Sequence, residues 1–127
     1  MRQTGESTNN NKKKIFFKLK IRHEYLYKMM LNTITMKVVG VSFEGRQTPI
    51  SELTINNALY LKPEPDNRYD SNAIQVFDEN DNRLGYIPKQ FAKLLKNKIT
   101  DRHKVSEFKR YGGGNRKNYG IEIKFNY

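Results

Sequence analysis

Short apolar runs separated by turn residues dominate the sequence from Met36 onward. Six runs are rich in β-branched or aromatic side chains: residues 36–44, 58–62, 73–77, 83–87, 105–110 and 119–125. Runs of this length, bounded by Gly, Pro, Asn and Asp, are typical of β-strands. About six short strands predict a mostly β domain, and closing them into a small barrel removes the exposed sheet edges.

The connections between the runs carry recognisable turn chemistry. Residues 46–56 contain Pro49 and predict a loop, whereas the Asp- and Asn-rich residues 78–82 predict a tight hairpin turn. The glycine run at residues 112–114 predicts a long, flexible hairpin loop between the last two strands. The chain therefore predicts strands joined mainly by turns and hairpins.

A single helix is expected after the fourth run, starting at Pro88, because proline is favoured at the first helical position. Its predicted apolar face consists of Phe91, Leu94 and Leu95. Lys89, Lys93 and Lys96 share another face at i, i+4 and i+7 spacing. That lysine face is either a solvated surface or a track for a phosphate backbone.

Residues 1–35 predict a basic N-terminal extension in front of a domain at residues 36–127. The polar residues 1–11 indicate disorder. Between residues 15 and 30, the apolar positions fit both an alternating strand and one face of a helix, so periodicity leaves both open. The predicted mostly β class therefore includes one or two helices.

Charge is concentrated at the two ends of the chain. The formal net charge is +11, of which residues 1–35 contribute 8 basic and 2 acidic side chains, and residues 99–127 contribute 7 and 3. Such an excess favours a polyanion partner, since lysine and arginine release counterions from phosphates. A solvated lysine-rich surface would explain the same composition.

Targeting and redox features are sparse. The chain has no cysteine, which excludes disulfides and thiolate metal sites and suits a reducing compartment. It has neither a signal-peptide pattern nor an apolar run of about 20 residues. We therefore expect a cytoplasmic protein without a membrane partner.

A longer motif is more specific than any of these patterns. Residues 61–76 read Leu-Lys-Pro-Glu-Pro-Asp-Asn-Arg-Tyr-Asp-Ser-Asn-Ala-Ile-Gln-Val, and Arg-Leu-Gly-Tyr-Ile-Pro follows at residues 83–88, before a helix containing Ala92. Together with Val39-Gly40-Val41, the order and spacing of these motifs resemble the pattern of the HIRAN family. The resemblance implies an OB-like barrel that binds single-stranded DNA at a free 3′ end and serves DNA repair or replication-related processing. It implies no catalysis and no cofactor.

The resemblance also assigns a binding site. It carries over Tyr69 and Asp70 as the end pocket, in which the carboxylate accepts a hydrogen bond from the 3′-hydroxyl and the ring stacks on the last nucleotide. Further predicted DNA-binding residues are Lys37, Lys62, Arg68, Asn72 and Tyr86, with the two lysines and Arg68 near phosphates. In a purely structural interpretation, Asp70 and Asn72 instead bond to nearby backbone amides and organise the loop.

The chain departs from the family pattern in its first strand. Helicase-linked members have an Arg and aromatic residues just before the glycine, where this chain has Met36-Lys37-Val38-Val39. Lys37 can supply the charge without the bidentate fork of Arg. Phe43 or Tyr86 would then have to supply the missing ring.

Two alternative functions remain open. Asp66, Glu122 and Lys124 are residue types that hold Mg²⁺ and position a nucleophile in nucleases, although they are far apart in sequence. A protein-interaction adaptor without DNA affinity would explain the missing first-strand ring. Residues 78–82 resemble the start of an EF-hand, but Arg83 and Lys89 stand where Gly and Glu are required, so no calcium site is expected there. The DNA-binding prediction itself includes no metal.

Overall fold

The computed structural model describes His23 and residues 32–115 and 117–127. The chain divides into two units, Met1–Asn32 and Thr33–Tyr127, and the second unit is compact. The predicted disorder of residues 1–11 and the strand-or-helix ambiguity at residues 15–30 lie outside the described residues. The second unit contains β1 (Thr33–Lys37), α2 (Gln47–Ser51), β2 (Leu59–Pro63), β3 (Ile74–Asp78), β4 (Arg83–Tyr86), α3 (Lys89–Leu95), β5 (His103–Lys104), β6 (Glu107–Gly112) and β7 (Tyr119–Asn126).

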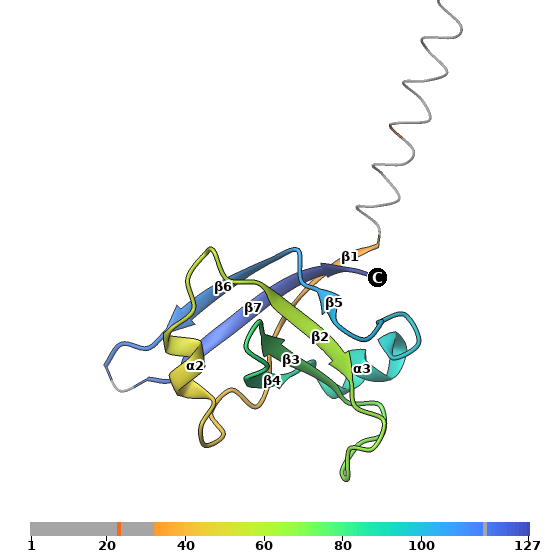
Figure 1. Ribbon diagram of the computed structural model, residues 1–127, viewed down its shortest axis with the longest axis horizontal. Coiled ribbons are helices and arrows are strands. Elements are labelled where there is room, and N and C mark those ends of the chain that lie inside the picture. Colours follow the sequence, from red (N-terminus) through yellow and green to blue (C-terminus); the bar gives the residue numbers. More distant parts are fainter. Residues whose placement is uncertain (1–22, 24–31, 116) are drawn as a thin grey trace, which may run out of the picture. The chain divides into compact units, whose positions relative to one another are not determined.

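The strands form two antiparallel sheets, ordered β1-β7-β6 and β4-β3-β2-β5 (Figure 1). The chain passes from one sheet to the other beyond β1, where the Val38 amide donates to Ile121 of β7 and Val39 then pairs with Tyr86 of β4. It passes back after β5, where Val105 donates to Leu59 and Ser106 donates to Lys124. The predicted mostly β, OB-like class is confirmed, but the two sheets are not closed into one barrel.

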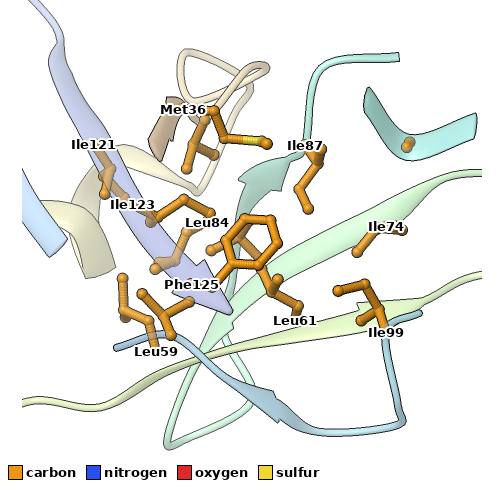
Figure 2. Close-up of a cluster of buried hydrophobic side chains, with 14 of the residues drawn as sticks. Met36, Leu59, Leu61, Ile74, Leu84, Ile87, Ile99, Ile121, Ile123 and Phe125 are labelled. Carbon is orange, nitrogen blue, oxygen red and sulfur yellow. The ribbon is translucent and has the colours of Figure 1, made fainter. Parts of the chain in front are cut away.

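Alternation along the strands builds the core between the sheets. In β7, Ile121, Ile123 and Phe125 are fully buried, whereas Glu122 and Lys124 point the other way. Figure 2 shows these three side chains meeting a larger apolar set, which includes Met36, Leu59, Leu61, Ile74, Leu84, Ile87 and Ile99. Burial of one face of each sheet therefore sets the register of the strands.

The region between β1 and β2 differs from its prediction. A strand was expected over residues 36–44, but β1 runs only from Thr33 to Lys37. The chain then turns at Gly40, whose φ is +73°. The predicted loop at residues 46–56 contains α2, which buries Ile50. Pro49 lies in the first turn of α2, where an amide has no intrahelical partner, so it does not prevent the helix.

Smaller differences occur near the C-terminal half. Pro88 precedes α3 as its N-cap, and the buried residues of α3 are Ala92 and Leu95, whereas Leu94 is 72 % exposed. β6 begins at Glu107, two residues later than predicted, because Val105 still pairs with β2 through Leu59. The two-residue strand β5 was not predicted, since it is too short to show a period.

Candidate functional site

A pocket of about 570 Å³ opens between the loop after β1, the loop between β2 and β3, strand β4 and the start of α3. Its lining residues are Val39, Gly40, Phe43 and Arg46 from the first loop, Glu64, Asn67, Arg68, Tyr69, Asp70 and Ala73 from the second, and Arg83, Tyr86, Ile87 and Lys89 from β4 and α3. The walls thus come from segments that are far apart in the sequence.

Close approach of two backbones joins the walls. Val39 and Tyr86 exchange backbone hydrogen bonds of 2.8 and 2.9 Å. A Cβ on Gly85 would lie 2.4 Å from the Val39 carbonyl oxygen, which is closer than a side chain tolerates. Glycine at position 85 therefore allows the loop after β1 to pack directly on β4.

Side-chain hydrogen bonds to backbone amides hold the loop between β2 and β3. Asn67 Oδ1 accepts from the amides of Tyr69 and Asp70, at 2.9 and 3.0 Å, and Asp70 Oδ1 accepts from the Asn72 amide at 2.9 Å. Within the described residues, Asp70 Oδ2 accepts no hydrogen bond. The same carboxylate therefore organises the loop with one oxygen and leaves the other available to a ligand.

Arg46 is the pocket cation that sequence reasoning missed. Its Nη1 donates to the Gly40 carbonyl at 2.7 Å, and its guanidinium lies over the rings of Phe43 and Tyr86, 4.8 and 5.4 Å from their centroids. In the described part of the chain it forms no ion pair. Arg46 is thus a positioned cation with unused donors.

Tyr86 forms the polar floor of the pocket. Its hydroxyl donates to Glu64 Oε2 at 2.8 Å, and Arg83 Nη2 lies 3.4 Å from Glu64 Oε1. Partial burial and the hydrogen bond to Glu64 raise the pKa of the Tyr86 phenol. The phenol therefore stays protonated at neutral pH and continues to donate its hydrogen bond to the Glu64 carboxylate.

The pocket combines cations with exposed rings. Its four basic residues, Arg46, Arg68, Arg83 and Lys89, outnumber the two acids, Glu64 and Asp70. The Phe43 and Tyr69 side chains are 64 % and 89 % exposed and belong to the two opposing loops. Such a lining accommodates a planar ring system that carries negative charge and a hydroxyl group.

Comparison with known families decides the identity of the fold. The family model of the HIRAN domain matches residues 31–126. This chain belongs to the HIRAN family. The crystal structure of the HIRAN domain of human HLTF superposes with a TM-score of 0.50 at 25 % identity, covering 74 % of each chain. No curated protein matches the chain significantly in sequence.

In this HIRAN domain, only part of the predicted residue set meets in one place. Arg68, Tyr69, Asp70 and Tyr86 line the pocket. The other three lie elsewhere: Asn72 sits in the same loop without lining the pocket, Lys62 borders a separate depression with Arg102, and Lys37 on β1 has its ammonium 5.3 Å from the centre of the Tyr111 ring. Their predicted roles in DNA binding stay predictions.

Phe43 and Tyr86 were the two rings considered as substitutes for the missing first-strand aromatic. In this HIRAN domain, both rings line the pocket. Arg46 and Asn67 had no comparable signal. Arg46 follows the expected strand, so a comparison strand by strand does not reach it. Asn67 lies inside the family motif, but its bonds to two amides depend on the loop conformation.

The residues considered for a nuclease lie on different elements. Asp66 is in the loop after β2, whereas Glu122 and Lys124 are on β7 of the other sheet, where Lys124 lies 3.4 Å from Glu107. Among the described residues, no group of three His, Asp or Glu side chains is placed to hold a metal ion. Asp78, in the EF-hand-like segment, accepts from the amides of Asn80 and Asn82 and closes the hairpin turn.

None of the described helices of the HIRAN domain is both long enough and apolar enough to span a bilayer.

Proposed function

We propose that this HIRAN domain binds single-stranded DNA at a free 3′ end, with the terminal nucleotide in the pocket between the loops after β1 and β2. HIRAN domains are binding modules for single-stranded DNA ends, and this chain shares their fold over most of its length. The observation that carries the proposal is the available Oδ2 of Asp70 in a pocket with exposed rings and with Arg46, which forms no ion pair among the described residues.

Asp70 is the group that would recognise the terminus. A carboxylate only accepts hydrogen bonds, so Oδ2 can take the proton of a 3′-hydroxyl while Oδ1 stays on the Asn72 amide. A 3′-phosphate in the same place would meet like-charge repulsion. The pocket should therefore distinguish the two termini.

The remaining groups would hold the nucleotide itself. Phe43 and Tyr69 offer ring faces to the terminal base or sugar, and base–aromatic stacking contributes about 1–3 kcal/mol per base. Arg46, Arg68 and Lys89 are available to the adjoining phosphates. Any phosphate contact of Lys37 or Lys62 would lie outside the pocket.

In the cell, such a module would serve repair or replication-related processing of DNA ends by binding rather than by catalysis. We propose a cytoplasmic role without a cofactor, in which the domain holds a DNA end on its own or for other DNA-processing proteins. The fold alone does not select a pathway, since function depends on the site.

The test is fluorescence anisotropy with short single-stranded DNA that ends in a 3′-hydroxyl or a 3′-phosphate. The hydroxyl end should bind more tightly by roughly tenfold or more, because a hydrogen bond to a charged group contributes about 1.5–3 kcal/mol. Asp70→Ala should remove the preference, and Asp70→Asn should reduce it while keeping an oxygen for the Asn72 amide. Asp66→Asn, in the same loop but outside the pocket lining, is the matched control.

Other outcomes would redirect the interpretation. Equal binding of both termini, with salt as the only influence, would make the protein a general basic DNA binder and leave Asp70 a structural residue. Failure to bind either oligonucleotide at low salt would favour the protein-interaction adaptor.

A further inference from the structure

We infer that a DNA strand, on leaving the end pocket, follows a row of three lysines on α3 and its C-cap, namely Lys89, Lys93 and Lys96. This inference rests on the proposed function, because it extends the end pocket into a surface for the nucleotides that precede the terminal one. Lys89 lines the pocket itself, so the row begins at the pocket wall. The row would thus add affinity that depends on strand length.

Helical spacing places the three lysines on one side of α3. At 100° per residue, positions i, i+4 and i+7 fall within an arc of about 60°. Along the axis they are separated by about 6 Å and 4.5 Å, at 1.5 Å per residue. All three side chains are exposed, whereas Ala92 and Leu95 occupy the buried side of α3. Flexible lysine side chains at these spacings can reach successive phosphates.

No nearby carboxylate offsets this charge along the chain. The segment between Asp81 and Asp101 contains no acidic residue, and its basic residues are Arg83, Lys89, Lys93, Lys96 and Lys98. As far as the chain is described, none of the three lysines of the row forms an ion pair. Solvated helices usually intersperse charges of both signs, so an unopposed row favours a polyanion.

The competing exit from the pocket crosses the outer face of the four-stranded sheet, because Arg83 borders both the pocket and a depression on that face. The depression includes the carboxylates of Asp81 and Asp101. Its cation Arg102 already lies 3.7 Å from Asp81. A strand on this route would meet like charges and would have to displace an ion pair, so α3 is the favoured route.

The experiment measures binding of the full-length protein to 3′-hydroxyl oligonucleotides of about 3 and about 12 nucleotides over a salt series. For the longer strand, Lys93→Gln/Lys96→Gln should reduce the magnitude of the slope of log affinity against log salt by about 1.4. Each phosphate contact on a single strand contributes about 0.7 to that slope. Each lysine should thus account for roughly fivefold of the gain in affinity when the salt concentration falls from about 1 M to about 0.1 M. Binding of the short strand and its preference for a hydroxyl end should not change.

Lys104→Gln/Lys109→Gln is the matched control, because it removes the same charge from exposed positions on β5 and β6. It should change the slope by less than half as much. The inference is overturned if the control flattens the slope equally, if the α3 variant weakens both strand lengths alike, or if it has no effect. If the unmodified protein binds neither strand, the proposed function itself fails.

Discussion

Among single residues, Arg46 links the architecture of the pocket to its chemistry. Its guanidinium is held by the Gly40 carbonyl and by the rings of Phe43 and Tyr86. A cation fixed in this way keeps less conformational freedom to lose when a phosphate binds. The chain therefore places an arginine in the pocket from the residue before α2 instead of from the first strand.

We predict that Arg46→Gln weakens binding of a short single-stranded oligonucleotide by about 1.5–3 kcal/mol, the range for a hydrogen bond to a charged group. Arg46→Lys should recover part of the loss, because it restores the charge without the planar stacking. Arg102→Gln is the control, since Arg102 also lies over a ring, 4.3 Å from the centroid of Tyr60, but outside the pocket. Anisotropy titrations would measure all three, and an equal loss in Arg102→Gln would refute a specific role for Arg46.

Among the elements, the junction between the loop after β1 and strand β4 depends on Gly85. We predict that Gly85→Ala lowers the free energy of unfolding by about 1–3 kcal/mol or more, because overpacking usually costs this much. The new Cβ would lie 2.4 Å from the Val39 carbonyl oxygen and 2.6 Å from Val38 Cγ1. The loop carrying Phe43 and Arg46 would then be displaced.

The measurement is urea denaturation monitored by circular dichroism, with Gly114→Ala as the control. A Cβ on Gly114 meets no atom of the described residues within 4 Å, so that variant should remain within about 0.5 kcal/mol of the parent. Equal stability of the two variants would show that the loop packs less closely on β4 than the structure indicates.

At the scale of the whole molecule, the pocket and the core both lie in the unit Thr33–Tyr127, while much of the charge lies outside it. Removing residues 1–30 takes away 8 basic and 2 acidic side chains, which leaves a net charge of +5 from the original +11. We propose that the remaining chain still folds, because β1 begins at Thr33.

The shortened chain should bind DNA more weakly and with a shallower salt dependence, because fewer counterions are released. Its preference for a hydroxyl over a phosphate terminus should persist, since the pocket residues are retained. Anisotropy at several salt concentrations would measure both quantities. Loss of the terminus preference would place part of end recognition within residues 1–30.

The pattern of short apolar runs was sufficient to predict β2, β3, β4 and β7 to within about a residue, because each run contains buried apolar side chains and is bounded by turn residues. It failed where a segment is too short or changes partner. β5 has two residues, α2 has five, and the chain beyond β1 pairs with β7 through Val38 and with β4 through Val39.

The fold class, the family and one wall of the pocket could be predicted from the sequence, because the motif from Glu64 to Ala73 closes its own loop through local hydrogen bonds. Only the tertiary structure brought Phe43 and Arg46 to the opposite wall. Their position depends on the turn at Gly40 and on backbone contact with β4, which lies some forty residues away in the chain. Periodicity and turn chemistry report contacts between near neighbours, whereas a pocket is made by side chains that meet only after the whole chain has folded.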